Sequence, residues 1–199
     1  MTSRSPSPER TAVGDRWFLA GYAGLAGFFA LEATVRQRGS AATLHASDDD
    51  AGTTSEIVRA FVLGAALPIL LRRLPLPHLP RWTAPLGLVM EATGLGARIW
   101  SMRALGAAYS RTLRTGAAQQ VVDAGPYRQV RHPGYLGTLL TWTGFSLTSG
   151  SLPVVPAVTL LFGRAYRRRI AAEERLLTRD LPGYDAYARR TKRLIPFVW

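Results

Sequence analysis

Five apolar segments, separated by polar and charged sequence, constrain this chain of 199 residues more than any other feature. They cover residues 17–35, 57–71, 83–102, 135–149 and 152–166. A helix rises 1.5 Å per residue, so the first and third segments come close to crossing a hydrocarbon core of about 30 Å, and the others reach about 22 Å. We therefore predict an all-α, polytopic integral membrane protein with about five transmembrane helices. Four spans with one re-entrant segment are the alternative.

The polar sequence between these segments suggests how the chain is divided. Residues 1–15 are rich in Ser and Pro and predict a disordered N-terminal tail. Residues 16–102 then hold three transmembrane helices, with a polar loop near residues 36–55. Residues 103–199 hold a helical hairpin, whose last helix continues into the cytosol through Arg179, followed by a C-terminal cytoplasmic segment.

The charges are distributed unevenly along the chain, which carries a net charge of +12. Residues 98–199 hold sixteen basic and five acidic side chains, whereas charges in residues 1–97 nearly cancel. Because the basic clusters flank apolar segments, they indicate the cytoplasmic face of a membrane, and we expect no nucleic-acid partner. The chain has no cysteine, which excludes thiolate nucleophiles and Cys-based metal sites. We expect no metal site.

The third apolar segment contains two charged residues, Glu91 near its middle and Arg98 towards its end. A carboxylate at the depth of Glu91 is costly unless it is paired or wetted, which makes it a candidate functional residue. The alternative is a protonated Glu, or one bonded to a neighbouring helix. Glu32, near the end of the first segment, is expected to reach the membrane interface.

Arg131-His132-Pro133 places a cation and an imidazole directly before a predicted helix, since proline suits the first helical turn. The N–H groups of residues 134–137 would then offer a seat for a carboxylate. Gly134 and Gly137 would let a flat group approach the backbone. The alternative is an ordinary basic stop at a membrane boundary, with His132 capping the helix or facing headgroups.

Glu173 and Glu174 follow the last apolar segment by two helical turns. Adjacent helix positions diverge by 100°, so we expect one carboxylate to bind a ligand cation. The other is expected to pair with Arg169, Arg175 or a neighbouring loop. A solvated helix face with an i,i+4 pair between Arg169 and Glu173 is the alternative.

Three patterns taken in order carry a family resemblance over roughly residues 103–197. They are Gly125-Pro126-Tyr127-Arg128-Gln129-Val130-Arg131-His132-Pro133-Gly134-Tyr135-Leu136-Gly137, then Glu173-Glu174, then Gly183-Tyr184-Asp185-Ala186-Tyr187 with Arg193-Leu194-Ile195-Pro196. Together they resemble the isoprenylcysteine carboxyl methyltransferase family and the related membrane methyltransferases that act on phospholipid amines.

The resemblance implies that residues 103–199 form a catalytic region that binds S-adenosylmethionine and releases S-adenosylhomocysteine, without a Rossmann domain. Carried over by position, the cofactor-binding residues would be Tyr127, His132, Pro133, Tyr135, Gly137, Glu173, Glu174, Tyr184 and Tyr187. The catalytic residues would be Arg131, Glu174 and Arg193.

The implied reaction is methylation of a carboxylate, or of another O, S or N nucleophile, on a lipophilic acceptor such as an isoprenoid or another lipid. Arg131, or else Arg193, would hold an acceptor carboxylate through two hydrogen bonds. Glu173 or Glu174 would serve as the base for an acceptor that must lose a proton. The acceptor is expected to enter from the membrane lipids between the third and fourth segments, and the site to face the cytoplasm of a bacterial inner membrane.

Two other functions remain open from the sequence. One is an NADPH-dependent membrane reductase of the steroid or sterol type, which has a similar basic stretch near its C-terminus. The other is a non-catalytic membrane protein that binds lipid.

Overall fold

The computed structural model describes residues 8–36, 50–106 and 120–196, and these residues form helices joined by turns. The elements are α1 (Pro8–Arg36), α2 (Thr53–Leu71), α3 (Thr83–Leu105), the 3-10 turn η4 (Gly125–Arg128), α4 (Pro133–Thr148), α5 (Val154–Asp180) and α6 (Tyr184–Arg190). No strand occurs within these ranges, so the all-α prediction is confirmed for them.

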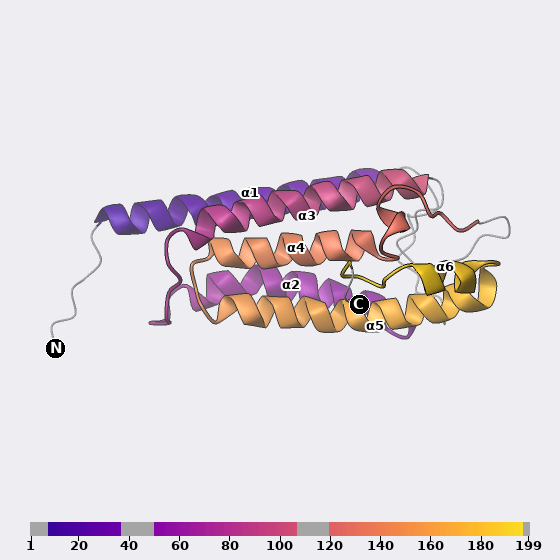
Figure 1. The fold of residues 1–199 in the computed structure, drawn as a ribbon. Coiled ribbons are helices and arrows are strands. Elements are labelled where there is room, and N and C mark those ends of the chain that lie inside the picture. The colour runs from indigo at the N-terminus through magenta and orange to yellow at the C-terminus, as the bar shows by residue number, and fades with distance from the viewer. Residues whose placement is uncertain (1–7, 37–49, 107–119, 197–199) are drawn as a thin grey trace.

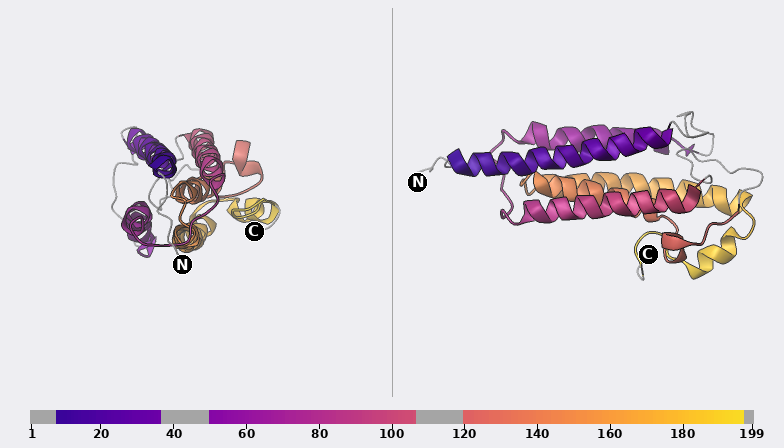
Figure 2. Two further views of the ribbon diagram at one scale, coloured as in Figure 1. Left: turned by 90° about the vertical axis from the view of Figure 1, so that its left-hand side faces the viewer. Right: turned by 90° about the horizontal axis from the view of Figure 1, so that it is seen from above.

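The five long helices lie side by side as a bundle (Figure 1). Viewed along the bundle, α4 lies in the middle and contacts α1, α3 and α5, while α2 packs mainly on α5 (Figure 2). One end of α5 runs past α4, and α6 folds back beside this extension (Figure 1). The C-terminal segment can therefore lie beside the first residues of α4, next to the part of α5 that extends past them.

The helix limits agree with the apolar segments in the second half of the chain and differ at the N-terminus. Helix α4 begins at Pro133, and α5 continues through Arg179 to Asp180, as predicted. Helix α1 begins at Pro8, so residues 8–15, expected in the disordered tail, are helical. The expected tail residues 1–7 and loop residues 37–49 lie outside the described residues.

Among the described helices, α2 alone is both long and apolar enough to cross a membrane, with a mean hydropathy of 1.6. Helix α4 has only 16 residues, which makes about 24 Å of helix. Helix α3 is continuous, but Glu91 and Arg98 interrupt its apolar sequence. The number of spans therefore stays a prediction.

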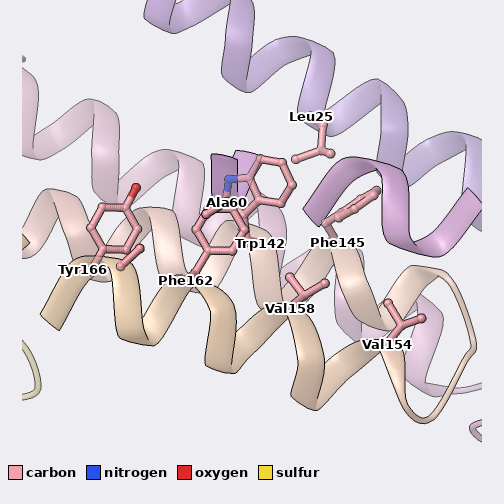
Figure 3. Packing of buried hydrophobic residues seen from close by; sticks show 9 residues of the cluster. Leu25, Ala60, Trp142, Phe145, Val154, Val158, Phe162 and Tyr166 are labelled. Atoms are coloured by element: carbon pink, nitrogen blue, oxygen red, sulfur yellow. The ribbon is translucent and has the colours of Figure 1, made fainter. Parts of the chain in front are cut away.

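The apolar core is centred on Trp142 of α4, which is fully buried (Figure 3). Its ring stacks on Phe162 of α5 with centroids 4.5 Å apart and on Phe61 of α2 with centroids 5.5 Å apart. Phe28 and Phe29 of α1 approach the same ring edge-on. This aromatic contact joins four of the five long helices.

Two pairs of glycines bring the backbones of α3 and α4 into contact. A Cβ added at Gly87 would lie 2.5 Å from the carbonyl oxygen of Gly144, and one at Gly94 would lie 2.5 Å from that of Gly137. Helices packed this closely leave no space between them for a lipid-sized molecule. The expectation that the acceptor enters between these two segments is therefore wrong.

Candidate functional site

The first and last of the three sequence patterns are joined through their backbones. The N–H of Arg131 donates to the carbonyl of Lys192 at 2.7 Å, and the N–H of His132 donates to that of Arg193 at 3.0 Å. The N–H of Lys192 donates back to the carbonyl of Gln129 at 3.0 Å. These bonds form a short parallel bridge that fixes the residues before α4 against the C-terminal segment.

The carboxylate of Glu174, on the extension of α5, lies where these two segments meet. Nε of Arg131 donates to its Oε1 at 2.7 Å, and Nε of Arg193 lies 2.8 Å from its Oε2. Nε2 of His132 lies 3.4 Å from Oε1. Burial by itself would raise the pKa of Glu174, but His132 and Arg131 outweigh burial and lower the pKa to about 2. Glu174 is therefore held as an anion.

Arg131 also anchors α6 to the site. Its Nη1 donates to the carbonyls of Ala188 at 2.8 Å and Thr191 at 2.5 Å, at the end of α6. On the other side of the short helix, the hydroxyl of Tyr187 donates to the carbonyl of Tyr127 at 2.8 Å. Only 8% of the Arg131 side chain is exposed, so its role in the structure is largely to hold protein groups together.

His132 lies between the two glutamates. Its Nδ1 is 3.9 Å from Oε2 of Glu173, and its ring stacks on Tyr135 with centroids 5.6 Å apart. The Tyr135 hydroxyl donates to Oε2 of Glu173 at 2.6 Å. Both glutamates thus face His132, so the expected divergence of their side chains does not separate them.

The hydroxyl oxygen of Tyr184 is buried and has no hydrogen-bond partner among the described residues, and Nε2 of His132 has only its 3.4 Å contact with Glu174. The pKa of Tyr184 is raised, first by burial and then by the charges of Glu174 and Glu173. Its hydroxyl therefore keeps its proton and has one hydrogen bond to give. Unsatisfied buried groups of this kind suit a polar ligand.

Some sequence expectations for the start of α4 are wrong. The N–H groups of Tyr135 and Leu136 both donate to the carbonyl of His132, so they offer no seat for a carboxylate. His132 occupies the N-cap position, but its side chain caps no N–H group, which removes the capping alternative. Gly137 lies against α3, so helix packing accounts for this glycine. Its role in lining a cofactor stays a prediction.

The remaining predicted residues lie near the cluster. Pro133 is the first residue of α4, as predicted. Tyr127 packs with Leu181, Tyr184 and Tyr187 in a small apolar core that holds η4, α6 and the end of α5 together. Residues 107–119 and 197, which belong to the span of the resemblance, fall outside the described residues. The cofactor and catalytic roles assigned to these residues stay predictions.

Two buried ion pairs beside the site were missed from the sequence. Arg98 of α3 pairs with Glu32 of α1 at 2.5 Å and donates to the carbonyl of Gly134 at 3.2 Å. Glu32 is thus buried inside the bundle and does not reach an interface. Arg169 of α5 is buried and pairs with Asp50 at 2.5 Å, so the alternative of a solvated Arg169–Glu173 face is wrong.

Comparison with known proteins gives matches over most of this region. The family model described as phospholipid methyltransferase matches residues 82–181, which is half of the chain. The cobalt-zinc-cadmium resistance protein CzcN of Cupriavidus metallidurans is 31% identical over 119 residues, or 58% of this chain and 51% of that protein. A probable protein-S-isoprenylcysteine O-methyltransferase of Oryza sativa is 29% identical over 167 residues, or 79% of this chain and 87% of that protein.

A solved structure also resembles the bundle. It is that of the eukaryotic intramembrane Ras methyltransferase ICMT (isoprenylcysteine carboxyl methyltransferase), with a TM-score of 0.55 and 23% identity. The match covers 74% of this chain and 51% of that one, and at this identity it shows a shared fold. The chain thus spans about half the length of CzcN and of the solved enzyme.

Proposed function

Because the chain belongs to the phospholipid methyltransferase family, we propose that it is an integral membrane enzyme that methylates a lipophilic acceptor with S-adenosylmethionine. The family membership confirms the resemblance carried by the three sequence patterns. One observation carries the proposal furthest. Arg131 of the first pattern and Arg193 of the third both contact the carboxylate of Glu174, which belongs to the second.

The distribution of side chains on the bundle supports a membrane location. The outward face of α2 carries large exposed apolar residues, Val58, Val62, Leu63, Ile69 and Leu70. Charged and hydroxyl side chains, among them Glu32, Arg98, Thr138 and Thr141, are buried inside. Apolar residues facing outward and paired polar residues facing inward suit a lipid environment. The basic excess of residues 98–199 supports a site on the cytoplasmic side of a bacterial inner membrane.

The residues present fit S-adenosylmethionine, which supplies a methyl group activated by a positively charged sulfur. In this cluster Glu173 accepts a hydrogen bond from Tyr135, and a carboxylate has room for further donors, such as the ligand's ammonium group. The hydroxyl of Tyr184 is a buried polar group without a partner among the described residues, so it could bind a polar atom of the ligand, and the His132 ring lies beside Glu174 in the same cluster. Glu174 would then organise the site through Arg131 and Arg193, and leave cofactor contact mainly to Glu173, His132 and Tyr184.

The charge state of Glu174 bears on the choice of acceptor. A carboxylate whose pKa is about 2 is a weak base, and it would not remove a proton efficiently from an amine, thiol or phenol. An acceptor carboxylate is already ionised at neutral pH and needs no base. The arginines that contact Glu174 thus make it a poor candidate for such a base, which leaves Glu173 for that role, whereas an acceptor carboxylate would need neither.

Arg193 is better placed than Arg131 to bind such a carboxylate. Nε and Nη1 of Arg131 both donate to protein groups, whereas 48% of the Arg193 side chain is exposed. Because about half of this side chain is exposed, an acceptor carboxylate could reach the Arg193 guanidinium while Arg131 stays enclosed by protein groups. Arg193 would thus align the acceptor oxygen, and the surrounding apolar helices would exclude water.

Calorimetric titration of the purified, detergent-solubilised protein with S-adenosylmethionine, S-adenosylhomocysteine and NADPH tests this function. We expect both adenosyl ligands to bind and NADPH to give no specific heat. Binding of NADPH with no response to either adenosyl ligand would instead support a membrane reductase. Absence of binding by all three would support a non-catalytic lipid-binding protein.

A further inference from the structure

A buried ion pair connects the beginning of α2 with the middle of α5. Nη1 of Arg169 lies 2.5 Å from Oδ1 of Asp50 and donates to the hydroxyls of Thr53 at 3.0 Å and Thr54 at 3.2 Å. The two charged side chains are only 3% and 2% exposed. Burying such a pair carries a desolvation penalty that its attraction often only offsets, so stability alone is a weak reason for its presence.

The other side of the Arg169 guanidinium faces the candidate site. Its Nε donates to the hydroxyl oxygen of Tyr135 at 3.3 Å. A guanidinium has donors only, so the Tyr135 hydroxyl accepts from Arg169 and must direct its own single proton elsewhere. That proton goes to Oε2 of Glu173, at 2.6 Å. Arg169 therefore fixes the direction of the hydrogen bond that Tyr135 makes to Glu173.

Tyr135 passes this orientation on to the rest of the site. Its ring lies parallel to that of His132, with an angle of 10° between the planes, and Glu173 lies beside the same imidazole. A rotation of the Tyr135 hydroxyl away from Glu173 would remove the hydrogen bond that this hydroxyl donates to the carboxylate. The contacts thus run without a break from Asp50 to Arg169, Tyr135, Glu173 and His132.

We propose that Asp50 and Arg169 are positioning residues, which hold Tyr135 and Glu173 in the orientation that binds the cofactor. Asp50 fixes the guanidinium from the side remote from the site, and Arg169 transmits this position to Tyr135. The inference rests on the proposed function, because Glu173 and His132 are taken to contact the adenosyl ligand. It adds the start of α2 to the parts of the chain on which cofactor binding depends.

The competing role for Asp50 is that of a simple helix cap. Its Oδ2 accepts the backbone N–H of Thr54 at 3.0 Å, and Oδ1 accepts the hydroxyls of Thr53 and Thr54. Asn at this position would keep an acceptor for the N–H of Thr54 and lose the negative charge that faces Arg169. Asp50→Asn thus separates the two roles.

The chain offers a matched control on the same two helices. Glu56 of α2 pairs with Arg168 of α5 at 2.6 Å, and this arginine is half exposed, whereas Arg169 is buried. Glu56→Gln removes one charge from an α2–α5 ion pair, as Asp50→Asn does, without touching the contacts that lead to Glu173. A general loosening of α2 from α5 would affect both variants alike.

The test measures the dissociation constant for S-adenosylhomocysteine in wild type, Asp50→Asn, Arg169→Lys and Glu56→Gln, with thermal unfolding recorded for each. We expect binding to weaken on the order of tenfold in Asp50→Asn and Arg169→Lys, and to stay within about twofold of wild type in Glu56→Gln. Lysine at position 169 keeps a charge for Asp50 but cannot reach Tyr135 at the same time.

A double-mutant cycle with Tyr135→Phe identifies the route. If the effect of Asp50 passes through the Tyr135 hydroxyl, adding Asp50→Asn to Tyr135→Phe weakens binding no further. Equal affinity in wild type, Asp50→Asn and Arg169→Lys would overturn the positioning role, as would full additivity in the cycle. Failure of the wild-type protein to bind S-adenosylhomocysteine would instead overturn the proposed function itself.

Discussion

Glu174 is a partly buried carboxylate and Glu91 a fully enclosed one, both on long helices of one bundle, and their surroundings are opposite. Glu174 is contacted by Arg131, Arg193 and His132, which reach it from two distant segments of the chain. Glu91 is 3% exposed, and neither of its carboxylate oxygens has a hydrogen-bond partner among the described residues. The Glu91 carboxylate lies against Gly24 of α1, and the Glu91 backbone lies against Gly144 of α4.

This difference favours Glu174 over Glu91 as the candidate functional carboxylate. The sequence pointed to both residues, Glu91 by its depth in an apolar segment and Glu174 by its pattern. Glu91 lies about 10 Å along α3 from Arg98, the α3 residue that touches the start of α4. The structure gathers charged partners around Glu174 and offers Glu91 none in the part of the chain that it describes.

The largest loss of stability is expected from removing Arg131, the main partner of Glu174. Arg131→Ala leaves this carboxylate without its closest cation and releases the carbonyls of Ala188 and Thr191 at the end of α6. Arg193 still pairs with Glu174 in this variant, so the expected loss is that of the hydrogen bonds made by the Arg131 guanidinium, roughly 3 kcal/mol. Thermal or denaturant unfolding in detergent measures the change, and Arg190→Ala, which removes an exposed arginine of the same short helix, is the control. A loss as small as that of the control would show that Arg131 does not organise this region.

A smaller change in stability, and one of opposite sign, is expected from replacing Glu91. Glu91→Leu removes buried oxygens that have no protein partner and keeps a side chain of similar size. An unsatisfied buried polar group costs about 1–3 kcal/mol, so we expect the variant to be more stable by up to this amount. The measurement is the unfolding of Glu91→Leu in detergent. The control is Glu91→Gln, which keeps a buried polar group at this position. Destabilisation by leucine would show that Glu91 makes a polar contact in the membrane.

The smallest effect concerns the pH dependence of stability. The pKa of Glu174 lies at about 2 in the folded protein, below its ordinary value of 4.5. A lowered pKa gives stability that is fully present above the unfolded pKa and is lost as pH falls through the folded value. We expect the stability difference between wild type and Glu174→Gln to be constant from pH 6 to 8 and to shrink by about 1 kcal/mol at pH 3.5. A difference that stays constant down to pH 3.5 would mean that the cations around Glu174 do not lower its pKa.

The sequence predicted the parts of this fold that depend on local patterns. The apolar segments, Pro133 at a helix start and the long extension of α5 follow from residue spacing and helix chemistry. The approach of Arg131, Glu174 and Arg193 follows from the family resemblance of the patterns that contain them.

The parts that the sequence did not predict depend on contacts between distant residues. Asp50 and Arg169 are 119 positions apart, and Glu32 and Arg98 are 66 apart, with no local signal to pair them. Glycine is equally suited to a ligand and to a neighbouring helix, so Gly137 could not be assigned to the α3 contact in advance.

The cofactor site that we propose is the polar cluster around Glu174, and the buried carboxylate of Glu91 lies outside it. The most direct test is the dissociation constant for S-adenosylhomocysteine in Glu174→Gln and Glu91→Gln, two identical substitutions in one detergent-solubilised protein. We predict that binding weakens about tenfold or more in Glu174→Gln and is unchanged in Glu91→Gln. Unchanged binding in Glu174→Gln, with a loss in Glu91→Gln, would contradict this account and move the site to the middle of the bundle.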